Sequence, residues 1–203
     1  MKPKGTLLMF LGALLILAAA GLTAYNMMES DKAKQSSAQI VQELGEQLTP
    51  PPAETTPGQM QPDYVRFPDM EMPVTNVEGQ NYVGTVQIPQ LGLELPVISE
   101  WNYEALKIAP CRYQGSAYTG GLILMAHNYP SHFGRIGELR FGDPVFFTDM
   151  AGNRFAYQVT DREELPGTAV EDMSAGNWDL TLFTCTYGGQ NRVTIRCTAL
   201  VEN

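Results

Sequence analysis

Two histidines and three cysteines limit the chemistry that this chain of 203 residues can perform. Cys185 ends the apolar run LTLFTC, and His127 ends another apolar run, LILMAH. Arg192 lies seven residues after the cysteine, beyond a Gly-Gly pair. Thiol catalysis needs a thiolate, a histidine that passes protons, and donors for the developing oxyanion. Because a guanidinium keeps its charge and offers several N–H donors, these three side chains together could supply the chemistry.

Each of these residues also has a purely structural interpretation. A lone cysteine at the end of an apolar strand is more often a small buried apolar residue than a nucleophile. A histidine at a strand end is commonly a neutral, hydrogen-bonded ring, and Arg192 could be a solvated residue beside a strand. His132, in NYPSHFG, is the competing base. We favour His127 because a strand end holds a ring more firmly than a Pro/Ser loop does.

The other two cysteines, Cys111 and Cys197, could form one disulfide, but their spacing does not establish it. We interpret them as structural or incidental thiols. The histidines and cysteines lack CxxC or HxxxH spacing, which argues against zinc. The acidic segment 162–178, before the cysteine run, shows no Ca²⁺ ligand pattern. We therefore expect no metal and no cofactor.

The first part of the chain predicts a membrane anchor. Residues 6–25 are an uncharged run of twenty, and as a helix they would span about 30 Å, the thickness of a bilayer core. Lys2 and Lys4 favour a cytoplasmic N-terminus, which places the rest of the chain outside the cell. A cleaved signal peptide is the alternative, with small residues at 18–20, but its apolar region is usually only about 7 to 15 residues long. We expect an uncleaved anchor over 1–28 in the cell membrane.

Residues 29–80 have the composition of an extracellular stalk. Seven of the fourteen prolines fall between Pro50 and Pro73, which favours extended chain without a core. Before them, the apolar residues of IVQELGEQL (40–48) stand at helical spacing, and we interpret this short helix as a spacer. The net charge of −9, without a basic stripe, argues against binding to nucleic acid.

Residues 81–203 predict an all-β domain. NYEALKIAP favours a short helix, GLILMAHN a strand buried on both faces, and Ala151-Gly152 a hairpin turn. Some seven or eight strands in this stretch fit a single closed β-barrel, because closure removes exposed strand edges. The predicted strands are YVGTVQIP, LELPVI, GLILMAHN, DPVFFTDM, NRFAYQVTDREEL, DLTLFTCT and RVTIRCTALVE.

The combination resembles the sortase family, membrane-anchored cysteine transpeptidases of mainly Gram-positive bacteria. The similarity covers about residues 81–203 and rests on the TLxTC-type cysteine strand, the downstream arginine and an H-N…F-G…L…G-D segment. YVGTVQIPQLGLELPV also looks like the opening strands of that barrel. Ala126 stands where glycine is common before the histidine, and this change leaves the imidazole untouched. The short connection from Cys185 to Arg192 leans toward class B. The segment's matching residues are His127, Asn128, Phe133, Gly134, Leu139, Gly142 and Asp143.

The resemblance implies an eight-stranded barrel and a defined reaction. Cys185 would attack a backbone carbonyl in an LPxTG-like sorting signal near the C-terminus of a secreted protein, forming a thioester. His127 would protonate the departing amine, and Arg192 would bind the substrate and stabilise the tetrahedral intermediate. An amine of a cell-wall precursor or a pilin lysine would then resolve the thioester.

Two other functions compete with this one. Peptidoglycan L,D-transpeptidases are also exported, β-rich cysteine enzymes, but they place glycine directly before the cysteine, where this chain has Thr184. A membrane-tethered β-barrel that binds without catalysis is the non-enzymatic alternative.

Overall fold

The computed structural model describes residues 3–47 and 61–200. Lys2, Leu48 and the prolines from Pro50 to Pro57, on which parts of the predicted anchor and stalk rest, lie outside these residues. The chain divides into two compact units, Met1–Lys32 and Ala33–Asn203. Helix α1 (Pro3–Gln47) begins in the first unit and ends in the second.

The first unit is the apolar part of α1. Its large apolar side chains, from Leu7 to Met28, are exposed. The helix is long and apolar enough near the N-terminus to cross a membrane. Because such a continuous apolar surface is unfavourable in water, this part of α1 is a candidate membrane span.

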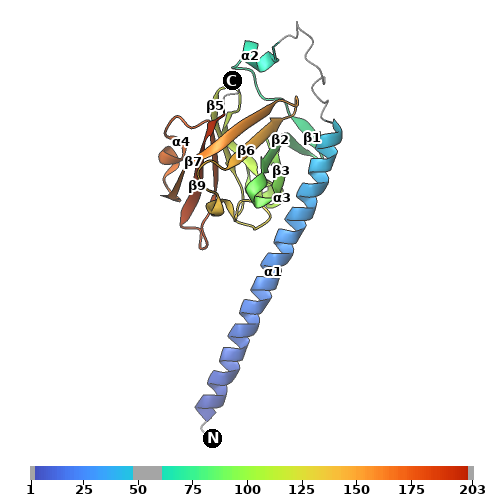
Figure 1. Cartoon of the computed structure of the whole chain (residues 1–203). Coiled ribbons are helices and arrows are strands. Elements are labelled where there is room, and N and C mark those ends of the chain that lie inside the picture. The colour runs from blue at the N-terminus through green and yellow to red at the C-terminus, as the bar shows by residue number, and fades with distance from the viewer. Residues whose placement is uncertain (1–2, 48–60, 201–203) are drawn as a thin grey trace. The chain divides into compact units, whose positions relative to one another are not determined.

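The second unit contains a closed barrel of eight strands, β2 to β9 (Figure 1). Neighbours follow the order β2-β3-β4-β5-β8-β9-β7-β6, and β6 pairs back onto β2, which closes the sheet. A ninth short strand, β1 (Thr75–Val77), pairs with β2 outside this circle. The predicted eight-stranded all-β barrel is confirmed. Its strands are β2 (Gln80–Ile88), β3 (Leu93–Ile98), β4 (Cys111–Ser116), β5 (Gly120–Met125), β6 (Pro144–Asp149), β7 (Arg154–Pro166), β8 (Leu180–Cys185) and β9 (Asn191–Ala199).

Closure of the barrel depends on a glycine where β2 meets β6. Gly84 pairs with Asp149, and a Cβ at this glycine would lie 2.2 Å from the carbonyl oxygen of Thr148. It would also lie 2.8 Å from the ring of Phe147, which is fully buried in the core. Only a residue without a side chain lets the two strands approach this closely.

Short helices lie before and between the strands. The predicted helix near residues 102–110 is present as α3 (Tyr103–Ile108), and the side chain of Asn102 caps it by accepting a hydrogen bond from Ala105 N at 2.8 Å. The predicted hairpin at Ala151-Gly152 joins β6 to β7. The other short helices are α2 (Asp63–Arg66), α4 (Val170–Ser174) and the 3-10 turns Pro89–Leu91 and Ile136–Glu138.

Strand β5 is buried on both faces, as its continuous apolar run predicts. Leu122 and Leu124 point into the main core inside the barrel. Ile123 belongs instead to an outer cluster with Met173 of α4 and Phe183 of β8. The strand that leads to His127 is therefore fixed by packing on its two sides.

The last part of α1 packs against the barrel. Its buried residues are Ala33, Ser37, Ile40 and Leu44, which recur at the spacing of one helical face. Ile40 and Leu44 share a buried cluster with residues of β2, β3 and α3. The helical periodicity of Ile40 and Leu44 thus marks a packed element, and a spacer role does not account for their burial, while Leu48 lies outside the described residues.

Candidate active site

The topology of the barrel brings the three predicted functional residues to one end. Strands β5 and β8 are parallel neighbours, with Met125 opposite Phe183, so the segments after both strands lie at the same end. His127 follows β5, and Cys185 is the last residue of β8. Strand β9 is antiparallel to β8 and starts at this end, which pairs Cys185 directly with Arg192.

A buried threonine ties the two parallel strand ends together. The hydroxyl of Thr184 donates a hydrogen bond of 2.8 Å to the carbonyl oxygen of Ala126. Ala126 N in turn donates to the carbonyl oxygen of Phe183 at 3.2 Å. Because Thr184 precedes the cysteine and Ala126 precedes the histidine, these bonds hold the two functional segments in register. This role of Thr184 was not predicted, although a polar residue inside an apolar strand is a recognisable signal.

His127, Cys185 and Arg192 line one cavity of about 370 Å³. One side of this cavity is aromatic, because the rings of Trp101, Tyr113 and Phe183 follow one another, with centroids 6.1 Å and 5.5 Å apart. Another side is formed by the connection between β7 and β8, including Val170 and Met173. The cavity therefore combines a thiol, an imidazole and a guanidinium with an apolar surface.

The environment of His127 favours its neutral form. The ring is half-buried, and burial, followed by the charge of Lys107, lowers its pKa from the ordinary value. The ring lies against that of Tyr129, with centroids 5.1 Å apart. A neutral imidazole can accept a proton from a thiol and return it later, as general acid–base catalysis requires.

His132 has a different environment. Its side chain is fully buried, and within the described part of the chain neither ring nitrogen has a hydrogen-bond partner. Burial, followed by the charge of His127, lowers its pKa to about 4. It does not line the cavity that holds Cys185. A buried neutral ring outside the cavity is a poor candidate for exchanging protons with a substrate.

The turn between β8 and β9 holds Arg192. Gly188 and Gly189 both adopt positive φ, 94° and 75°, which lets the chain reverse tightly after Cys185. One guanidinium nitrogen, Nη1, donates to the carbonyl oxygens of Gly189 at 2.9 Å and Asn191 at 3.0 Å. The remaining nitrogens can point to a ligand in the cavity.

The three cysteines are all free thiols. Cys111 and Cys197 are fully buried, and burial raises the pKa of each thiol to about 12. Cys185 is partly exposed in the cavity. No group of three or more His, Cys, Asp or Glu side chains suited to a metal ion occurs among the residues that the structure describes.

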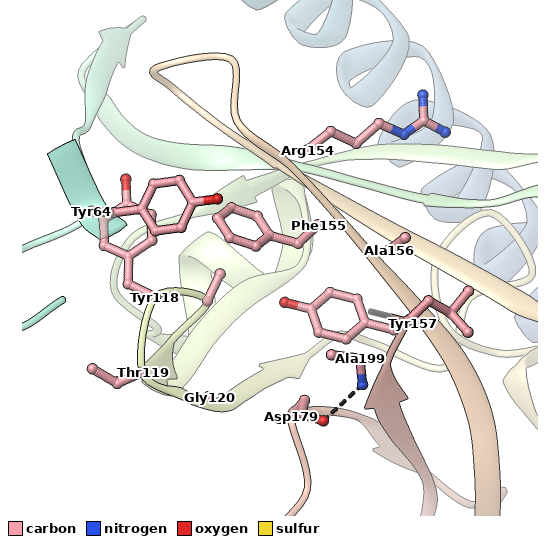
Figure 2. Close-up of a pocket in the computed structure, with 12 residues that line it drawn as sticks. Tyr64, Tyr118, Thr119, Gly120, Arg154, Phe155, Ala156, Tyr157, Asp179 and Ala199 are labelled. Carbon is pink, nitrogen blue, oxygen red and sulfur yellow. Dashed lines mark hydrogen bonds between the residues drawn. The ribbon is translucent and has the colours of Figure 1, made fainter. Parts of the chain in front are cut away.

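A second cavity, of about 450 Å³, lies at the opposite end of the barrel (Figure 2). Figure 2 shows the rings of Tyr64 and Tyr118 stacked beside it, with Asp179 below them. Gly120 and Asp179 stand at the starts of β5 and β8, so six residues of strand, or about 20 Å, separate this cavity from Cys185. It is lined by neither cysteine nor histidine.

Comparison with known protein families decides what this arrangement is. Residues 86–200 match the family described as Sortase domain, which is more than half of the chain. The chain belongs to the sortase family. It is therefore a cysteine transpeptidase, and the competing functions, an L,D-transpeptidase or a binding module, are set aside.

Solved structures of other sortases have the same fold. Sortase C1 of Streptococcus agalactiae (type II crystal structure) is 25% identical, with a TM-score of 0.53 over 63% of this sortase and 71% of that chain. A sortase D5 transpeptidase of Clostridium perfringens is 14% identical, with a TM-score of 0.57 over 84% of this sortase and 99% of that chain. Sortase A of Corynebacterium diphtheriae is 16% identical, with a TM-score of 0.55 over 92% of this sortase and 97% of that chain. A search of curated proteins gave no match. The class B leaning stays a prediction.

Proposed function

We propose that this sortase cleaves an LPxTG-like sorting signal near the C-terminus of secreted proteins and joins the new carboxyl end to an amine. In this proposal Cys185 is the nucleophile, His127 the general acid and base, and Arg192 the group that binds substrate and stabilises the oxyanion. The supporting observation is that these three side chains line one cavity at the ends of β5 and β8 and the start of β9.

The reaction divides into two acyl transfers. Cys185 Sγ loses its proton to the neutral ring of His127 and forms a bond with the carbonyl carbon of the signal. The resulting oxyanion is stabilised by Arg192. The intermediate collapses when the C–N bond breaks, and His127 gives its proton to the departing amine. An incoming amine then attacks the thioester, His127 accepts its proton, and the proton returns to Cys185 as the thiolate leaves.

The acceptor in this scheme is an amine of a peptidoglycan precursor or a lysine of a pilin. Sortases are membrane-associated, and the apolar part of α1 is the candidate span. We propose that α1 keeps the N-terminus in the cytoplasm and the barrel outside the cell, where secreted proteins and cell-wall precursors meet. The two lysines before the span favour this orientation.

A panel of sorting-signal peptides analysed by mass spectrometry tests the proposal. The wild type should cleave at least one peptide, form a thioester adduct on Cys185 and transfer the acyl group to an added amine. Cys185→Ala should form no adduct, whereas the control Cys111→Ala should retain it, because that thiol is buried outside the cavity. Cleavage by Cys185→Ala, or no cleavage of any peptide by the wild type, would contradict the proposed reaction.

The roles of the other two residues need separate variants. Arg192→Lys should lower kcat/KM by about a hundredfold, because a single ammonium replaces the directed donors of the guanidinium. His127→Ala should lose turnover, whereas His132→Phe should keep it at neutral pH. Normal turnover by His127→Ala would transfer the role to another base.

A further inference from the structure

The connection between β7 and β8 (residues 167–179) forms one side of the active-site cavity. It contributes Gly167, Ala169, Val170 and Met173 to the lining. The short helix α4 lies within this connection. Several hydrogen bonds hold it to the barrel, and two of these contacts reach different parts of the site.

The first contact joins the start of the connection to Arg192. Gly167 N donates a hydrogen bond of 2.8 Å to the carbonyl oxygen of Gln190, in the turn that carries Arg192. A Cβ at Gly167 would lie 2.9 Å from that oxygen and 3.2 Å from Nη1 of Arg192. Gly167 does not have a positive φ, so alanine would fit its backbone conformation. The glycine provides space first for the carbonyl oxygen of Gln190, which belongs to the turn that carries Arg192, and then for the guanidinium itself.

The second contact joins the end of α4 to a buried arginine. Arg196 of β9 is only 2% exposed, and its guanidinium donates to the carbonyl oxygens of Asp172 and Met173, each at 2.7 Å. Its Nε also donates to Glu163 at 2.7 Å, and Nη1 donates to the hydroxyl of Thr181 at 3.1 Å. A charge buried this deeply is stable only when its donors are satisfied, so α4 is bound to the barrel as one of the partners of Arg196.

Met173 connects this anchor to the cavity. Its backbone carbonyl accepts from Arg196, while its side chain packs with Ile123 and Phe183. Met173 and Phe183 both line the cavity.

Loss of the Arg196 guanidinium would leave two carbonyl oxygens without their charged donor. It would loosen α4, which would keep the hydrogen bond of 2.9 Å from Gln114 Nε2 to the hydroxyl of Ser174. This loss should change the shape of the cavity beside α4. It should leave Cys185 and His127 in place, because other hydrogen bonds hold their segments.

We propose that Gly167 and Arg196 are positioning residues with separable effects. Gly167 determines the position of the Arg192 guanidinium, and Arg196 determines the position of α4, which forms one side of the cavity, here called the groove wall. The inference rests on the proposed function, because it assigns the groove to the sorting signal and Arg192 to the oxyanion. A displaced Arg192 should lower the rate of the chemical step, whereas a displaced wall should weaken binding of the peptide.

Steady-state kinetics of Gly167→Ala test the first effect. A shift of the guanidinium by a few tenths of an ångström should lower kcat about tenfold. KM should rise by no more than about threefold, less than kcat falls, because Arg192 also binds the substrate while α4 keeps its contacts with Arg196. Gly137→Ala is the matched control, since its backbone φ is not positive and the nearest atom to the added Cβ is 3.6 Å away. Equal kcat for Gly167→Ala and the control would overturn this part.

Arg196→Lys tests the second effect. A lysine cannot reach both carbonyl oxygens and Glu163 at once, and the loss of a charged hydrogen bond should raise KM about tenfold with kcat nearly unchanged. Thr181→Val is the control, because it removes the longest of the four bonds and leaves both carbonyl contacts intact. If Arg196→Lys does not fold, Glu163→Gln replaces it. This variant removes the negative charge that orients the guanidinium, so both carbonyl contacts should loosen and KM should rise about threefold, whereas Thr181→Val keeps that charge.

The outcomes separate this inference from the proposed function. An inactive wild type, or an active Cys185→Ala, refutes the reaction itself. A wild type that depends on Cys185, together with normal kinetics for both positioning variants, refutes only the inference. A lower kcat with unchanged KM in Arg196→Lys would also overturn the inference. Such a result indicates a smaller fraction of folded enzyme, which lowers the apparent kcat and leaves KM unchanged.

Discussion

Protonation of His132 should destabilise the folded chain at acidic pH. Its pKa is about 4 in the folded state, against 6.5 as the ordinary value, because burial, followed by the charge of His127, disfavours the protonated ring. Within the described part of the chain no hydrogen-bond partner offsets this cost. The unfolded chain therefore binds this proton more readily than the folded chain does. The stabilisation is complete above about pH 6.5 and is lost as the pH falls toward about 4.

The two pKa values set the size of the effect. For one group with these values, linkage gives a loss of about 2 kcal/mol at pH 5 and about 3 kcal/mol at pH 4. Urea unfolding of the full chain in detergent, followed by tryptophan fluorescence between about pH 7.5 and pH 4, measures the free energy of unfolding. His132→Phe keeps a ring at this position and removes the titration.

The comparison uses the pH dependence of each protein, so a constant cost of the phenylalanine cancels. The wild type should lose about 3 kcal/mol more than His132→Phe over this range. Parallel pH profiles would refute the reasoning, since they would mean that the ring finds a partner or that water reaches it in the folded state.

Three further predictions concern packing, thiol reactivity and charge. Leu44→Ala should lower the stability of the full chain by about 3 kcal/mol, because Leu44 is fully buried. Gln35→Ala, on the exposed side of α1, should change the stability little. Equal thermal unfolding of the two variants would refute the packing of α1 on the barrel. A maleimide should label Cys185 in the folded protein and the two buried cysteines only after unfolding, as peptide mapping by mass spectrometry would show; uniform labelling would contradict their burial. Lys107→Gln should raise the pKa of His127, because a nearby positive charge is removed. The limb of the pH profile of kcat/KM that reports His127 should therefore move to higher pH. An unmoved limb would show that the charge of Lys107 does not influence the reaction.

The barrel and the gathering of the site residues follow from patterns that a sequence displays. Apolar runs of strand length predicted the sheet, and closure followed from the need to cover strand edges. His127 and Cys185 each end such a run. Because β5 and β8 are parallel neighbours, the segments after both strands lie at the same end of the barrel. This agrees with the prediction that His127 and Cys185 belong to one site.

The parts of the site that were not predicted depend on contacts distant in sequence. Arg196, in VTIRC, reads as an ordinary exposed strand residue, and its burial depends on Glu163 and on carbonyl oxygens of a connection more than twenty residues away. Gly167 reads as a turn glycine, although a Cβ at this position would crowd the carbonyl oxygen of Gln190 and the guanidinium of Arg192. Local periodicity reports which face of a strand is apolar, and it carries no information on which distant group will neutralise a buried charge.

The last part of α1 connects the packing of the chain to the site. Leu44 and Leu106 belong to one buried cluster, and Leu106 also lines the cavity that holds Cys185. A truncation that begins at residue 81 would remove Ile40 and Leu44 from this cluster and expose the surface that they cover. Because cores relax only partly around a lost side chain, α3 and with it one side of the cavity would lose support. Soluble forms of this sortase should therefore begin after the uncharged run of residues 6–25 and no later than Ala33, where the second unit begins.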